Sequence, residues 1–82
     1  MKTLASMQPD TSGLVIEAAA ENPDLQSRIY SLGIYPGVKV EVLRFAPAGD
    51  PIQIRCGHTL LSIRKREAAL VSVEMLDGDT DT

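Results

Sequence analysis

The chain has 82 residues and a formal net charge of −3, with one cysteine and no tryptophan. A chain of this length forms a single domain, and none of its apolar runs approaches the ~20 residues that a membrane-spanning helix needs. One cysteine excludes a disulfide within the chain, and the first residues lack the apolar stretch of a signal peptide, so we expect a soluble cytoplasmic protein.

Charge is distributed unevenly along the chain. Residues 28–66 contain seven basic and two acidic side chains, whereas residues 67–82 contain five acidic side chains and no basic one. A basic middle segment can attract an acidic partner, although a solvated barrel surface explains the same pattern more simply. The acidic total and the small number of aromatic residues argue against a nucleic-acid-binding protein.

The first strong signals predict a strand followed by a helix. Residues 13–20 form a short, mostly apolar run that is typical of a strand. Asn22 suits the N-cap of a helix that we predict over Pro23–Leu32, because proline is well tolerated at the first helical position. Gly33 is expected to end this helix with a positive φ angle. The apolar side chains spaced for one face of the helix are Leu25, Ile29 and Leu32.

Four more strands are predicted in the second half of the chain. Residues 38–45 alternate apolar and polar side chains after a Pro-Gly turn. Residues 51–56 and 59–64 are two short apolar runs separated by two residues, which predicts a β-hairpin. Residues 65–70 suit a helical turn, and residues 71–75 alternate again as a last strand.

The register of the hairpin follows from its apolar side chains. A turn at Gly57 and His58, with glycine at the first position of a type II′ turn, pairs Ile54 with Leu61. A turn at Cys56 and Gly57 would leave the inward isoleucines without apolar partners, so we expect the first register. The core predicted from this alternation contains Val38, Val40, Val42, Ile52, Ile54, Leu61, Ile63 and Val71 or Val73.

Five short strands and one early helix suggest a small, strongly bent β-barrel. We expect this domain to occupy residues 1–76. The remaining residues, 77–82, read DGDTDT and are expected to form a disordered acidic tail.

The order and spacing of several short motifs resemble the FeoA family of ferrous iron transport proteins. The family pattern begins with Leu-Gly, a short gap, Pro-Gly and an alternating strand. A loop rich in proline and glycine, an apolar strand ending in basic residues and a Glu-Ala pair follow, and the similarity runs from about Gly13 to Glu74. In this chain the motifs are Leu32-Gly33, Pro36-Gly37, residues 47–51, Ile63-Arg64-Lys65 and Glu67-Ala68.

The resemblance implies a mainly β fold, a five-stranded SH3-like barrel with one helical insertion after the first strand. It also implies a cytoplasmic accessory protein that binds the cytoplasmic domain of a FeoB-type transporter and modulates ferrous iron uptake, without entering the membrane itself. A small metal carrier and a nucleic-acid-binding barrel are the alternatives. No catalytic triad, paired catalytic carboxylates or phosphate loop is readable, so we expect neither enzymatic activity nor a required cofactor.

Cys56 and His58 are the metal ligands that the sequence suggests. A thiolate and an imidazole suit zinc or a similar divalent metal, and iron accepts histidine as well. Two ligands do not close a tetrahedral site, so a carboxylate, an anion or a second chain would have to complete it, which leaves a metal-bridged homodimer open. The simpler interpretation makes Cys56 a small core residue and His58 a solvated turn residue.

A partner-binding surface is expected around the second half of the hairpin. The register points Leu60 outward, where an exposed leucine can anchor a partner if other apolar groups lie beside it. The basic side chains Arg64, Lys65 and Arg66 follow at the end of the strand. The loop of residues 46–51 is the third part of this surface, because loops on a rigid sheet commonly carry binding function.

Overall fold

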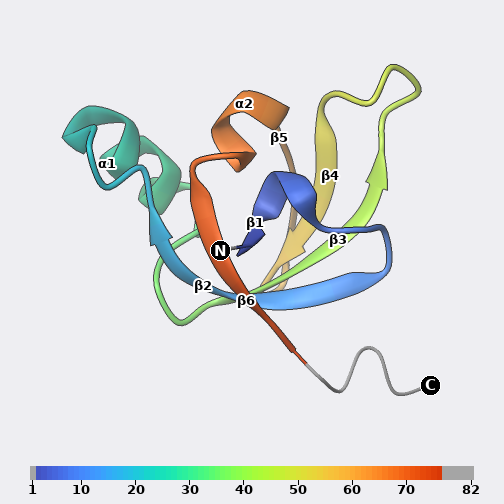
Figure 1. Cartoon of the computed structure of the whole chain (residues 1–82), viewed down its shortest axis with the longest axis horizontal. Helices are drawn as coiled ribbons and strands as arrows, with labels where there is room; N and C mark the ends of the chain where they lie inside the picture. The colour runs from blue at the N-terminus through green and yellow to red at the C-terminus, as the bar shows by residue number, and fades with distance from the viewer. Residues whose placement is uncertain (1, 77–82) are drawn as a thin grey trace.

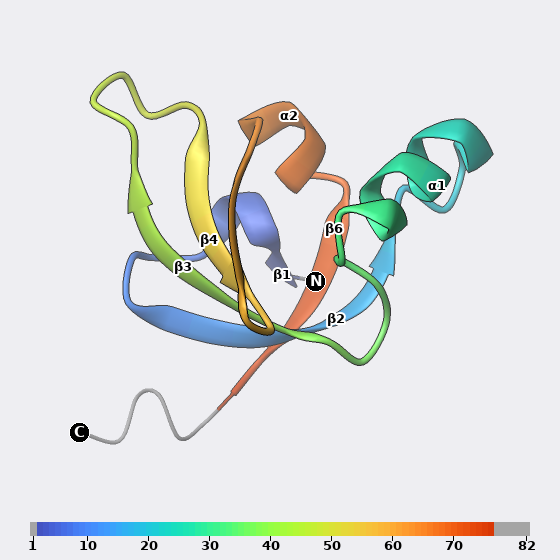
Figure 2. The ribbon, with the colours of Figure 1, turned by 180° about the vertical axis from the view of Figure 1, so that it is seen from behind.

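The computed structural model describes residues 2–76, and within them six antiparallel strands form one sheet in the order β1-β6-β2-β3-β4-β5. Figures 1 and 2 show the sheet curling around a central core, with one helix standing outside it. No helix in this part of the chain is long and apolar enough to cross a membrane. The elements are β1 (Lys2–Thr3), η1 (Leu4–Ser6, a 3-10 turn), β2 (Thr11–Ala18), α1 (Pro23–Ser31), β3 (Lys39–Phe45), β4 (Ile52–Cys56), β5 (Thr59–Ile63), α2 (Lys65–Ala68) and β6 (Val71–Met75).

The mainly β, SH3-like fold is confirmed, with a correction to the strand count. Five strands were expected, and the sixth is the two-residue β1, which pairs with β6. So short a strand carries too little alternation to be recognised in the sequence. Strands β1 and β5 are the two edges of the sheet, so the barrel is not closed by hydrogen bonds within residues 2–76. The tail expected over residues 77–82 lies outside the described residues.

The predicted hairpin register is confirmed. Ile54 pairs with Leu61 and Ile52 with Ile63 along β4 and β5. Gly57 has a φ of 62°, as the first position of a type II′ turn requires. Because successive side chains of a strand point to opposite faces, this register turns the isoleucines toward the core and their neighbours toward solvent.

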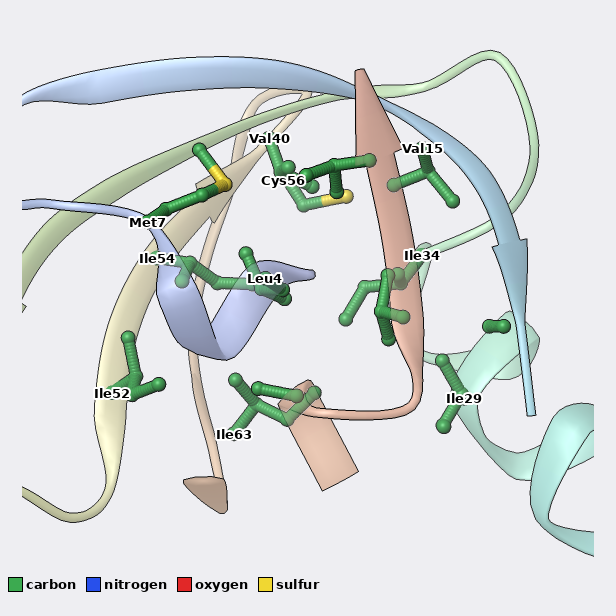
Figure 3. Packing of buried hydrophobic residues seen from close by; sticks show 14 of the residues in the cluster. Leu4, Met7, Val15, Ile29, Ile34, Val40, Ile52, Ile54, Cys56 and Ile63 are labelled. Atoms are coloured by element: carbon green, nitrogen blue, oxygen red, sulfur yellow. The ribbon is translucent and has the colours of Figure 1, made fainter. Parts of the chain in front are cut away.

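The core contains most of the residues expected from the alternation. Two of the predicted set, Val38 and Leu61, are only half-buried and pack against the core from its margin. Val38 precedes the first residue of β3, and Leu61 lies on an edge strand, so neighbouring strands cover neither side chain fully. Figure 3 shows Leu4, Met7 and Ile34, which were not predicted, pointing into the same cluster. The buried members of the predicted set are Val40, Val42, Ile52, Ile54, Ile63, Val71 and Val73.

The helix α1 ends one residue earlier than predicted. Its last residue is Ser31, and the backbone N–H of Gly33, with φ 99°, donates to the carbonyl of Tyr30. The N–H of Ile34 donates to the carbonyl of Ile29, which completes a Schellman motif with an apolar contact across it. The expectation that Leu32 lies on the buried face is therefore wrong: the chain turns there, and Ile34 takes the buried position.

Replacing Ile54 with alanine should destabilise the domain by about 2–5 kcal/mol, because it removes a fully buried side chain and leaves a cavity. The matched control is Leu60→Ala on the neighbouring strand, where the side chain is exposed and the expected change is below about 0.5 kcal/mol. Urea unfolding of the three proteins measures both values. Equal midpoints for the two variants would contradict the register.

Candidate partner-binding surface and the Cys-Gly-His turn

Cys56 lies on the inner face of β4, among the core residues. Its side chain is 5% exposed, and its Sγ donates a hydrogen bond to the carbonyl of Gly33 over 2.9 Å. Figure 3 shows the sulfur pointing into the interior. Burial raises the pKa of the Cys56 thiol above its ordinary value, because the apolar surroundings disfavour the thiolate. The hydrogen bond from the Cys56 thiol to the Gly33 carbonyl connects the hairpin to the end of α1.

His58 lies on the other side of the turn, in solvent. It lines a hollow of about 320 Å³ together with Lys39, Glu41, Arg55 and Gly57. The Arg55 guanidinium donates to the Glu41 carboxylate over 3.0 Å across the outer face of β3 and β4. With two cationic side chains and one carboxylate around it, this hollow suits an anionic group better than a cation.

The residues do not form a complete metal site. Within residues 2–76, no three side chains of histidine, cysteine, aspartate or glutamate come together where a metal ion would be chelated. The structure also separates the two suggested ligands, since Cys56 faces the core and His58 faces solvent. Of the two suggested ligands, only His58 is accessible in a single chain.

The outer face of β4 and β5 carries an open apolar groove. Its volume is about 250 Å³, and Leu60, which is 66% exposed, forms one side of it. The half-buried Leu43 forms another side, at the point where the register between β3 and β4 shifts. The predicted outward direction of Leu60 is confirmed, and Leu43 gives it an apolar neighbour. The lining residues are Leu43, Gln53, Ile54, Leu60, Leu61 and Ser62.

The basic run begins where β5 ends. Arg64, Lys65 and Arg66 are all exposed, and Arg64 occupies the N-cap position of α2, where its carbonyl accepts from the N–H groups of Glu67 and Ala68. The backbone N–H of Lys65 donates to the Asp50 carboxylate over 2.9 Å, so the loop of residues 46–51 is held against the start of α2. Leu60 lies four residues before Arg64, about 13 Å along an extended strand. The three parts of the predicted surface are thus connected through β5 and the Asp50 contact.

Sequence reasoning missed the neighbours of these residues. Because Val38, Val40 and Val42 are predicted to point inward, the alternation places the apolar residue Leu43 on the outward face. That signal could have predicted an apolar neighbour for Leu60. The hollow around His58 was not predictable in the same way, because Lys39 and Glu41 come from β3 and Arg55 from β4. Only strand pairing brings them together.

Comparison with known proteins identifies a family. The family model described as the FeoA domain matches residues 2–75. The chain is 38% identical to the FeoA protein of Chlorobium tepidum, with a TM-score of 0.85, over 95% of this chain and 73% of that one.

Two further solved structures are similar over nearly their whole length. An iron uptake regulatory protein, FeoA, is 31% identical over 90% of this chain and 94% of that one, with a TM-score of 0.77. The FeoA of Stenotrophomonas maltophilia, described as a prokaryotic SH3 domain protein complexed with zinc, is 27% identical over 90% of this chain and 91% of that one, with a TM-score of 0.77.

The Cys56 thiol should react slowly with DTNB at pH 8 while the protein is folded. Burial and the raised pKa both lower the concentration of accessible thiolate, so a rate at least about tenfold below that of the unfolded chain is expected. The same protein in guanidinium chloride is the control. Equal rates in the two conditions would show that the thiol is accessible in the native state.

Proposed function

The chain belongs to the FeoA family, which is associated with ferrous iron transport, and from this premise we propose that it binds the cytoplasmic part of a FeoB-type transporter and modulates ferrous iron uptake. The observation that carries the proposal is the exposure of Leu60 beside a basic surface. The protein acts in the cytoplasm as an accessory subunit. Its contribution is a preformed surface and not a catalytic step.

The binding surface consists of Leu60, the basic residues 64–66 and the loop of residues 46–51. Residues 46–66 contain four basic side chains and one acidic side chain, Asp50, so this part of the molecule attracts an acidic region of the partner. The exposed charges raise the rate of encounter, and their effect weakens with added salt. Leu60 acts after encounter, because burying an apolar anchor slows dissociation.

Family membership and geometry support different parts of this proposal. Membership of an iron-transport family supports the transporter as partner. The choice of surface is supported by the geometry alone, since Leu60 and Leu43 form an apolar groove beside a basic segment. A rigid sheet holds both, so binding requires little ordering of the protein, and less binding energy is lost to conformational entropy.

A second candidate property is favoured by the zinc complex of the Stenotrophomonas maltophilia relative. Within this proposal, His58 is the accessible ligand of a divalent ion such as zinc or iron, and a second chain completes the shell in a metal-bridged homodimer. Lys39 and Arg55 lie around the same hollow and repel a cation, so the affinity is low. Cys56 joins the shell only if the core around it opens.

In a pull-down with the transporter's cytoplasmic domain, Leu60→Asp and Arg64→Glu should each weaken binding by about tenfold or more, a loss of about 1.4 kcal/mol. Ile16→Asp and Lys2→Glu are the matched controls, because they replace an exposed apolar and an exposed basic side chain by an acidic one on other strands. Both controls should bind as the wild type does.

The results test the choice of binding surface separately from the proposed function. Folded Leu60→Asp and Arg64→Glu variants that bind as the wild type does would contradict the chosen surface. A wild-type protein that binds neither the domain nor the intact transporter, together with unchanged iron uptake after deletion of its gene, would contradict the function.

Zinc titration should show weaker binding for His58→Ala than for the wild type, together with loss of zinc-dependent dimerisation in sedimentation experiments. Cys56→Ala should bind zinc as the wild type does, because the thiol faces the core. Equal zinc affinity in the wild type and His58→Ala would end the metal proposal. A loss of zinc affinity in Cys56→Ala would indicate that the Cys56 thiolate is also a zinc ligand.

A further inference from the structure

Strand β5 leaves one edge of the sheet open. Within residues 2–76 it pairs with β4 alone, and it is the last strand of the sheet. Thr59, Leu60 and Ser62 are exposed along it. An open edge is a ready template for another strand, because its backbone donors and acceptors have no partner in the sheet.

The register identifies which backbone groups point outward. In a hairpin with a two-residue turn, the residues flanking the turn form a hydrogen-bonded pair, which here is Cys56 with Thr59. The N–H of Gly57 donates to the carbonyl of Lys39 on β3, so odd-numbered residues of this part of β4 bond to β3 and even-numbered ones to β5. On β5, Leu60 and Ser62 therefore direct their N–H and C=O groups away from β4.

Nothing in the composition of β5 protects this edge. Its sequence, TLLSI, contains no charged residue and no proline, the usual devices against strand addition. The opposite edge differs, because β1 has only two residues and one of them is Lys2. The N–H of Thr3, the other residue, already donates to the Ser6 hydroxyl. The open edge of β5 is thus the one suited to pairing.

We propose that the free edge of β5 receives an extended acidic segment of the transporter's cytoplasmic part as an additional β-strand. The inference rests on the proposed function and specifies how the partner is held. Backbone bonds to Leu60 and Ser62 supply affinity that depends little on sequence, and side chains of the added strand supply selectivity. Leu60 then covers apolar side chains of the incoming segment.

Charge complementarity argues for an acidic segment as the occupant. The nearest charged side chains in sequence on either side of β5 are Arg55 and Arg64, and no acidic residue lies between Asp50 and Glu67. Arg55, which is directly opposite Leu60 on β4, is already paired with Glu41. The attraction for an acidic segment therefore comes from the exposed side chains of Arg64, Lys65 and Arg66 at the end of β5. A glutamate or aspartate at the end of the added strand that lies beside them experiences a favourable field, and a basic residue does not.

The test uses overlapping peptides that tile the transporter's cytoplasmic domain, added to the full chain labelled with ¹⁵N. A peptide containing acidic residues should slow amide hydrogen exchange at Leu60 and Ser62 by at least about tenfold, because strand addition gives both N–H groups a partner. This measurement requires no variant. Protection confined to other strands, or no protection in a bound complex, would overturn the proposal.

A pair of variants at one position separates backbone pairing from side-chain contact. Ser62→Pro removes the outward N–H, and its ring blocks the incoming strand, while the bonds to β4 are retained. It should weaken binding of the same peptide by about tenfold or more, whereas Ser62→Ala should bind as the wild type does. Exchange protection of the β4 amides verifies that Ser62→Pro is folded.

The outcomes distinguish this inference from the proposed function. If Leu60→Asp loses binding to the cytoplasmic domain and folded Ser62→Pro keeps it, the function stands and strand addition fails. If no peptide and no transporter fragment binds, both fail. If the Leu60 and Ser62 amides are already protected in the free chain, and lose protection when residues 77–82 are deleted, this chain's own acidic end is the occupant and the transporter segment is not.

Discussion

The register between β4 and β5 is the constraint on which the remaining features depend. A two-residue turn beginning with Gly57 sets it, and strand alternation then assigns every neighbouring side chain to a face. The same register buries Ile54, turns the Cys56 thiol inward and leaves Leu60 in solvent. It also determines which backbone groups of β5 face the open edge. A slip of β5 by one residue against β4 would turn Leu60 inward, reverse which backbone groups of β5 face the edge, and remove Leu61 from its place opposite Ile54.

Local contacts hold the other elements to this hairpin. The Schellman motif at the end of α1 buries Ile34, and the Gly33 carbonyl beside it accepts the hydrogen bond from Cys56. An ion pair of 2.9 Å between Arg28 and Glu67 connects α1 to α2. Because the Arg28 side chain is largely exposed to solvent, the ion pair contributes little stability. The core and the turns therefore provide the rigidity that a docking surface needs.

The proposed binding surface combines three features. An apolar groove around Leu60 lies next to a basic segment and to an unprotected strand edge. An exposed edge carries a risk of aggregation, and its retention in a folded domain is understandable if a partner covers it. All eleven acidic residues lie outside residues 51–66, so the chain is acidic in total while this segment is basic.

The elements whose signals are local could be predicted from the sequence. Alternation located the hairpin and most of the core, the capping residues located α1, and motif order indicated the family. Features that depend on residues distant in the chain became visible only in the folded structure. Leu4 and Ile34 enter the core because β1 and the end of α1 return to the sheet, and the hollow at His58 exists because β3 pairs with β4. No local pattern encodes these contacts, since each requires two segments to be paired first.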